Sequence, residues 1–438
     1  MGSHHDIEPE DDRRERTYLV GLVVPGLRRT IVEEHLDELD RLVDTAGGEV
    51  VGRGAQERKQ PDPATLVGRG YLHRLADICE EENVDALVFD EDLTASQVRN
   101  IEAEVPDSVK VIDRAAVILD IFAQHARSRE AQTQVELAQL GYLLPRLTRR
   151  WSHLSRQAGG IGTRGVGETQ LEIDRRLIKR RMAQLRDKLE VIERDRRLRR
   201  ERRADVSTVA VVGYTNAGKS SLFRRLTGAD VLVEDRLFAT LDPRSRRVGL
   251  GEDVTVVLTD TVGFIRKLPH DLVAPFRSTL EEATVADLVL HVVDASHPTW
   301  EEHLRVGEEV LEGLGVERER TLVVLNKIDL LANGRPRVFG RRVQPVAVSA
   351  VSGDGIQELK DVIRTRLLSA PDVAILRVPL EEAELVQQAV GMPHQLAQRY
   401  GDREVQLALR ADLSSLAECG LEEFRVSQWD GMDGDGGP

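Results

Sequence analysis

The sequence predicts a multidomain α/β protein with a phosphate-binding loop near its middle. Residues 213–220 read Gly-Tyr-Thr-Asn-Ala-Gly-Lys-Ser and fit the pattern G-x-x-x-x-G-K-[ST]. The apolar run 208–212 before them is typical of a buried strand, and residues 221–226 after them are typical of a helix. Further apolar runs, each followed by a polar loop, continue this order, which indicates a doubly wound parallel sheet.

The predicted loop has the chemistry of a phosphate site. Its glycines adopt backbone conformations that other residues resist, and the next helix presents free N–H groups and a positive dipole end. Lys219 is placed to reach the β- and γ-phosphates, and the Ser220 hydroxyl to ligate Mg²⁺. The residues expected to contact the nucleotide here are Gly213, Tyr214, Thr215, Asn216, Ala217, Gly218, Lys219, Ser220 and Ser221.

A second segment predicts guanine as the base. Asn-Lys-Ile-Asp at 326–329 follows the apolar run 321–325. The Asp329 carboxylate can accept two hydrogen bonds from the guanine N1–H and amino group, which adenine cannot offer, and such discrimination reaches ~10⁴-fold. The Lys327 stem can cover the purine, and Asn326 can tie this segment to the phosphate loop. The residues expected near the base are Asn326, Lys327, Ile328, Asp329, Ser349 and Ala350.

Two segments between these loops are expected to respond to the γ-phosphate. Asp260 follows an apolar run and suits a water-bridged contact to Mg²⁺, while the Gly263 N–H suits the γ-phosphate. Thr240 is the expected second Mg²⁺ ligand, and its backbone is expected to position the attacking water together with Lys219. The residues in these segments are Phe238, Ala239, Thr240, Leu241, Asp242, Asp260, Thr261, Val262 and Gly263. Together the motifs predict a P-loop GTPase domain.

Phe264 departs from the commonest GTPase pattern. Many such proteins place there a glutamine that orients the attacking water, which an apolar side chain cannot do. We therefore expect slow intrinsic hydrolysis that needs help. The help could come from K⁺ beside Asn216, or from a large partner that orders residues 234–246. Simple packing of Phe264 in the switch is a second interpretation, compatible with the first.

Composition favours a cytoplasmic protein, and we expect it to be monomeric when free. The cysteines Cys79 and Cys419 provide no disulfide framework. No apolar stretch approaches the ~20 residues of a membrane span, and no signal peptide is recognisable. The opening residues 1–5 are set aside as an expression remnant.

The net charge of −14 hides a strongly basic segment. Residues 175–203 contain fourteen Lys/Arg against five Asp/Glu, and residues 146–167 contain five Arg and no acid. Apolar residues recur at helical spacing over 171–192 and 135–144, with the glycine- and arginine-rich stretch 159–167 between them. This pattern predicts an antiparallel helical hairpin with a Gly-rich tip. A solvated charged face is the plain alternative, but the basic excess continues through the loop and favours RNA phosphate contact.

The remaining segments predict two smaller domains. Strand-like runs at 18–24, 85–89 and 109–112 with helices between them indicate an N-terminal α/β domain without a catalytic constellation. Alternation at 405–409 indicates a small α+β C-terminal domain. The predicted boundaries are 1–16 for a disordered or expression-derived tail, 17–127 for the N-terminal domain, 128–204 for the helical hairpin, 205–370 for the GTPase domain, 371–429 for the C-terminal domain and 430–438 for a disordered tail.

These motifs resemble the HflX family of translational GTPases over nearly the full chain. The most specific matches lie at 123–127, 134–140, 159–162, 164–165, 167–172, 174–176, 238–243, 260–265 and 268–271. The resemblance implies binding to the large ribosomal subunit and its RNA, ribosome-stimulated GTP hydrolysis, and splitting or rescue of stalled ribosomes. It implies that the tip reaches toward the peptidyl-transferase region, where Val166 replaces the family's usual proline and could loosen the tip.

Two alternatives stay open. The chain could be a GTP-switched module that binds a protein partner through its basic helices. It could also be an RNA-remodelling NTPase that uses the N-terminal domain. The resemblance also links that domain to nucleotide binding, although no motif in the sequence supports the link.

Overall fold

The computed structural model describes residues 14–147, 170–201, 206–228, 238, 242–251, 254–266, 282–331, 344–392, 394–411 and 413–429. These residues form two compact units, one up to Lys188 and the other from Leu189 onward. Each unit is described by itself. The finer division into six parts that the sequence suggests stays a prediction.

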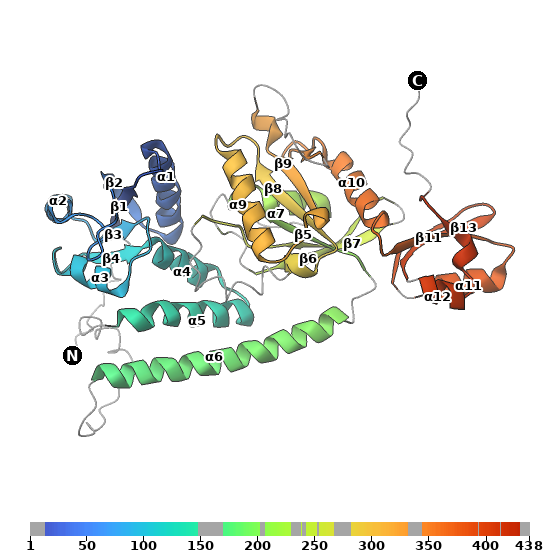
Figure 1. Ribbon diagram of the computed structural model, residues 1–438, viewed down its shortest axis with the longest axis horizontal. Helices are drawn as coiled ribbons and strands as arrows, with labels where there is room; N and C mark the ends of the chain where they lie inside the picture. Colours follow the sequence, from blue (N-terminus) through green and yellow to red (C-terminus); the bar gives the residue numbers. More distant parts are fainter. Residues whose placement is uncertain are drawn as a thin grey trace, which may run out of the picture. The chain divides into compact units, whose positions relative to one another are not determined.

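The first unit contains a four-stranded parallel sheet in the order β2-β1-β3-β4 (Figure 1). Its strands are β1 (Arg16–Val23), β2 (Glu49–Glu57), β3 (Ala86–Phe89) and β4 (Lys110–Asp113). Its helices are α1 (Arg29–Ala46), α2 (Arg69–Glu81), α3 (Ala95–Glu102) and α4 (Arg114–His125). One boundary differs from the prediction: β1 begins at Arg16, within the stretch assigned to the tail, because the Arg16 N–H donates to Asp85 Oδ2 at 2.8 Å.

Two further helices follow, α5 (Arg129–Arg146) and α6 (Gln170–Glu201). The α5 helix begins where the Ser128 hydroxyl accepts from the Ala131 N–H at 3.0 Å, a common N-cap. The α5 helix and the first part of α6 run side by side in opposite directions (Figure 1), and Arg181 binds both oxygens of Glu136 at 2.6 and 2.8 Å. The predicted helical hairpin is therefore present, while its tip at 159–167 lies outside the described residues.

Buried charges join α5 to the carboxyl end of the N-terminal sheet. The fully buried Arg114 guanidinium lies 3.0 Å from both Glu38 Oε1 and Asp90 Oδ1. Asp113, also fully buried, accepts from the Tyr142 hydroxyl of α5 at 2.9 Å. Because an unpaired buried charge is costly, each group requires its partner in place. The network therefore holds α5 at a defined position on the sheet.

The second unit contains a six-stranded sheet in the order β10-β9-β8-β5-β7-β6, parallel except for β6. Its strands are β5 (Thr208–Gly213), β6 (Arg244–Gly249), β7 (Thr255–Asp260), β8 (Leu288–Asp294), β9 (Thr321–Asn326) and β10 (Val346–Ala347). Its helices are α7 (Lys219–Thr227), α9 (Trp300–Gly313) and α10 (Ile356–Leu368). Because α7 and α10 cover one face and α9 the other, the central strands are apolar on both faces.

A small antiparallel sheet, β12-β13-β11-β14, completes the second unit. Its elements are β11 (Val373–Pro379), α11 (Ala383–Gly391), β12 (Gln395–Tyr400), β13 (Glu404–Arg410), α12 (Leu413–Glu418) and β14 (Arg425–Val426). One face packs on its own helices through residues such as Leu376 and Leu416. The other face, with Ile375, Ala408 and Trp429, belongs to the same apolar core as α10 and the six-stranded sheet. The two sheets therefore share a core.

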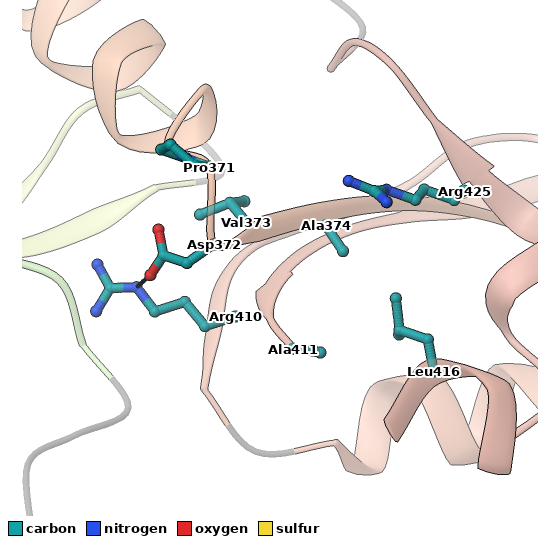
Figure 2. A pocket seen from close by; sticks show the side chains of 8 residues that line it. All are labelled: Pro371, Asp372, Val373, Ala374, Arg410, Ala411, Leu416 and Arg425. Atoms are coloured by element: carbon teal, nitrogen blue, oxygen red, sulfur yellow. Dashed lines mark ion pairs between the residues drawn. The ribbon is translucent and has the colours of Figure 1, made fainter. Parts of the chain in front are cut away.

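Arg410 reinforces this junction. Its guanidinium lies 2.7 Å from Asp287 Oδ1 and 3.0 Å from Asp372 Oδ2, and the second oxygen of Asp287 accepts from the Thr208 N–H at 2.6 Å. The chain of contacts thus runs from β13 to the first residue of β5. Figure 2 shows Arg410 and Asp372 at a pocket of about 490 Å³ in the C-terminal domain. The pocket contains no residue of the predicted nucleotide site.

Among the described helices, none is long and apolar enough to cross a membrane.

We expect Arg410→Ala to loosen the junction, because Asp287 and Asp372 would both lose their cation. The free energy of local opening should fall by about 1–3 kcal/mol. Hydrogen exchange should therefore quicken both in β11 and at the start of β5. Arg377→Ala is the matched control, since its partner Glu404 (3.1 Å) lies within the C-terminal sheet. Faster exchange confined to that sheet in both variants would show that Arg410 does not join the two sheets.

Candidate nucleotide-binding site

The phosphate loop lies between β5 and α7, where close packing requires its glycines. Gly213 has φ of 147°, and a Cβ there would lie 2.1 Å from the Val292 carbonyl oxygen. Gly218 has φ of 84°, and its Cβ would lie 2.3 Å from Asn326 Nδ2. Because backbone and a buried amide occupy those positions, no larger side chain fits without moving the strands. The loop is therefore shaped by its neighbours β8 and β9.

Lys219 begins α7 and points back over the loop. Its Nζ donates to the Tyr214 carbonyl oxygen at 2.8 Å, and the side chain is buried. Burial lowers the pKa of Lys219 to about 8, although the charge of Asp260 acts in the opposite direction. A phosphate beside this ammonium would favour its charged form. The predicted contact of Lys219 with the β- and γ-phosphates stays a prediction.

Two oxygen-bearing side chains meet beside the lysine. The Ser220 hydroxyl donates to Asp260 Oδ2 at 2.8 Å, and Asp260 is fully buried at the end of β7. Hydroxyl and carboxylate oxygens are ligands that Mg²⁺ accepts. Gly263 lies just beyond Asp260, and a Cβ there would lie 2.8 Å from Lys219 Nζ. The backbone of Gly263 thus adjoins the lysine expected at the γ-phosphate.

The base segment is tied to the phosphate loop through Asn326. Its Nδ2 donates to the Ala217 carbonyl oxygen at 2.9 Å, as the sequence predicted, and its Oδ1 accepts from the Ala350 N–H at 3.1 Å. One buried amide therefore connects the phosphate loop to both base loops. Ser349, beside Ala350, is fully buried, whereas Asp329 is exposed.

Lys327 is held by a residue that the sequence analysis missed. Its backbone has φ of 63°, and its Nζ lies 2.7 Å from Asp294 Oδ2 at the end of β8. Burial alone would raise the pKa of Asp294, but hydrogen bonds from Lys327 and Ser296 outweigh burial and lower it. The ion pair sets the direction of the lysine stem. Asp294 could have been found from its place at the end of an apolar run.

Phe264 packs behind the site. It is buried in a cluster with Ala210, Ala283 and Leu311, and its ring meets His291 edge-on with centroids 6.2 Å apart. The side chain is held within this core. The geometry therefore agrees with the packing interpretation of Phe264 and gives it no contact suited to orienting water.

Some predicted residues lie outside the described part of the chain. These are Ala239, Thr240 and Leu241, so the proposed second Mg²⁺ ligand stays a prediction. Their neighbours are described: Phe238 is buried with φ of 57°, and Asp242 is partly exposed.

Three family models match the chain. Residues 33–123 match a "GTP-binding GTPase N-terminal" model, and residues 125–203 a "GTP-binding GTPase Middle Region" model. Residues 208–327 match a model described as "50S ribosome-binding GTPase".

Individual relatives agree with these matches. A protein named GTPase HflX from Caldanaerobacter subterraneus is 47% identical over 80% of this chain and 81% of its own length. The GTPase HflX of Escherichia coli is 45% identical over 80% and 83%, and that of Alkalihalophilus pseudofirmus 51% over 68% and 70%. Among solved structures, a GTP-binding protein from Sulfolobus solfataricus in complex with GDP is 26% identical, with coverage of 80% and 98% and a TM-score of 0.42.

We expect Asp329→Asn to shift the base preference from guanine toward xanthine. The amide replaces one acceptor with a donor, so affinity for GTP should fall by about tenfold or more while that for xanthosine triphosphate rises. Competition binding with both nucleotides measures the ratio. Asp354→Asn, in the neighbouring loop, is the control for a general charge change. An unchanged ratio of the two affinities in Asp329→Asn would remove this carboxylate from base recognition.

Proposed function

This chain belongs to the HflX family of GTPases, and we propose that it acts on the large ribosomal subunit to split or rescue stalled ribosomes. Its GTPase domain is of the ribosome-binding type. The observation that carries the proposal is that the family match includes the basic helical hairpin, at 125–203, as well as the GTPase domain. A cytoplasmic, monomeric protein is the form we propose for the free state.

The first step is GTP binding at the carboxyl ends of β5, β7 and β9. The loop from Gly213 to Ser221 would hold the phosphates, with Lys219 at the β- and γ-phosphates. Asn326 would keep this loop in register with the base segment, where Asp329 would accept from guanine. The Lys327 stem, aimed by Asp294, would cover the purine face.

Mg²⁺ fits the oxygen pair of Ser220 and Asp260. Their oxygens lie 2.8 Å apart in a partly buried position beside Lys219, and both are hard donors. Ser220 would ligate the ion directly and Asp260 through water, with Thr240 as the second direct ligand. When bound, the ion would neutralise charge that develops on the phosphates.

Hydrolysis would rely on the ribosome. Phe264 is packed in the core and supplies no hydrogen bond to water, so the Thr240 backbone and Lys219 would position the attack when a partner binds beside them. Within the stretch 234–246 that the sequence assigned to ordering by a partner, Arg244 to Arg246 already belong to β6 and pair with β7. A K⁺ ion beside Asn216 would add positive charge near the phosphates. Asn216 is exposed in the loop with φ of 60°, which leaves its side chain accessible.

We expect Lys219→Ala and Ser220→Ala each to reduce ribosome-stimulated GTP turnover by about 10²-fold or more, because both remove transition-state charge stabilisation. Phe264→Leu should lose much less, since a packed apolar side chain is replaced by another. Phosphate release with and without large subunits measures all three.

The same assay tests the monovalent ion. Turnover should be faster in KCl than in NaCl at equal ionic strength, and Asn216→Ala should abolish the difference. Equal wild-type rates in the two salts would contradict a K⁺ site.

The Phe264→Leu variant has its own contrary outcome. A variant as inactive as Lys219→Ala, with its fold intact, would contradict a packing role for Phe264.

RNA binding would lie on the helical hairpin. The α6 helix has twelve Lys/Arg against seven Asp/Glu, and the side chains of Arg175, Lys179 and Arg180 are exposed. Exposed cations on a helix bind RNA phosphates and release counterions, so binding weakens as salt rises. A protein partner on this surface is the alternative, as is RNA remodelling by the N-terminal domain. Loss of RNA activity in Lys219→Ala would exclude the latter.

We expect Lys179→Gln and Arg180→Gln each to flatten the log–log salt dependence of binding to large subunits by up to about one unit. Arg99→Gln, an exposed arginine of α3, is the matched control.

Deletion of residues 159–167 should leave GTP affinity of the free protein unchanged but impair subunit dissociation, measured by light scattering. Wild-type splitting by the deletion variant would favour the protein-partner alternative.

A further inference from the structure

Tyr214 connects the phosphate loop to the segment after Asp260 at several points. The Thr215 N–H donates to the Phe264 carbonyl oxygen at 2.7 Å, and the Phe264 N–H donates to the Gly213 carbonyl oxygen at 2.8 Å. Tyr214 and Phe264 thereby form a short parallel bridge. The Tyr214 hydroxyl oxygen accepts from the Arg266 backbone N–H at 2.9 Å. Its side chain thus extends the pairing by two residues beyond the bridge.

The ring of Tyr214 is held from the other side by α9. It stacks on His303 with ring centroids 4.1 Å apart and an interplanar angle of 6°. His303 in turn lies against His297, with centroids 4.5 Å apart. His297 is fixed at the start of α9, where its Nδ1 accepts from the Thr299 N–H at 3.2 Å. Tyr214 is buried, so this stack sets where its hydroxyl points.

The tethered segment lies next to the residue expected at the γ-phosphate. Gly263 adjoins Lys219 so closely that a Cβ would come within 2.8 Å of the ammonium nitrogen. Lys219 itself donates to the Tyr214 carbonyl oxygen at 2.8 Å. A shift of residues 263–266 would therefore change the position of the Gly263 N–H relative to the lysine. Hydrolysis is sensitive to shifts of this kind because catalysis depends on preorganised donors.

We propose that Tyr214 and His303 are positioning residues for GTP hydrolysis, which together hold residues 263–266 where the γ-phosphate binds. The proposal rests on GTP lying in the phosphate loop, as proposed above. Neither side chain is required to contact the nucleotide for this role. Because GDP lacks the γ-phosphate, its binding should not depend on the tether. The tether should matter for GTP alone.

The test compares the free protein and its variants in single-turnover hydrolysis and in binding of GDP. Tyr214→Phe removes only the hydroxyl and should slow hydrolysis by about three- to tenfold, the effect of one hydrogen bond. GDP affinity should stay within about twofold, because the substitution leaves the backbone of the phosphate loop in place and the hydroxyl is bonded to the Arg266 N–H. His303→Ala should slow hydrolysis similarly, and His303→Phe should restore it, because a phenyl ring can stack on Tyr214. Tyr400→Phe is the matched control, a tyrosine 61% exposed in β12.

A second readout reports the tether directly. Hydrogen exchange of the Arg266 amide, with a non-hydrolysable GTP analogue bound, should quicken in Tyr214→Phe and His303→Ala but not in His303→Phe. Wild-type turnover and exchange in Tyr214→Phe would overturn the proposal. So would an equal loss of GTP and GDP affinity, which would indicate a general structural role. Because all measurements use the free protein, the outcome is independent of whether the protein splits ribosomes.

Discussion

The nucleotide site depends on one buried amide. Asn326 donates to the Ala217 carbonyl oxygen and accepts from the Ala350 N–H, so three loops from distant parts of the sequence are held in one register. A buried amide that lost either partner would leave an unsatisfied polar group, which is costly. The same side chain lies against Gly218, which explains why that position has no room for a Cβ. The two hydrogen bonds of Asn326 therefore fix the phosphate loop and the base segment relative to each other.

In the segment after Asp260, the side chain of Phe264 serves packing rather than catalysis. The phenyl ring belongs to the core behind the site, while the backbone of the same residue pairs with Gly213 and Thr215. This leaves Lys219, the oxygen pair of Ser220 and Asp260, and the Gly263 backbone as the groups that we propose to contact the phosphates. A GTPase of this design keeps its charge-stabilising groups but has no water-orienting side chain at position 264. This arrangement is the reason for our proposal that a large partner activates hydrolysis.

The distribution of charge along the sequence separates the helical hairpin from the rest of the chain. The whole chain has a net charge of −14, whereas basic residues concentrate on α6 and the rest of the helical hairpin.

The C-terminal sheet shares the core of the GTPase domain and is joined to β5 through Arg410 and Asp287. The GTPase domain and the C-terminal sheet thus form one packed unit.

The sequence by itself determined the fold class, the strands β5, β7 and β9 with the helix α7, and the motifs at Gly213 to Ser221 and Asn326 to Asp329, but not β6, β8, α9 or α10. Such features depend on local pattern, because apolar runs and glycines report the backbone conformation of their own segment. The tertiary structure decided what pattern cannot encode: that Asp294 aims Lys327, that His303 stacks on Tyr214, and that Arg410 joins two sheets. Each of these contacts joins two residues that lie far apart in the chain or on separate elements. Their contact follows only from how the strands and helices pack, since nothing in the local spacing of either partner specifies the other.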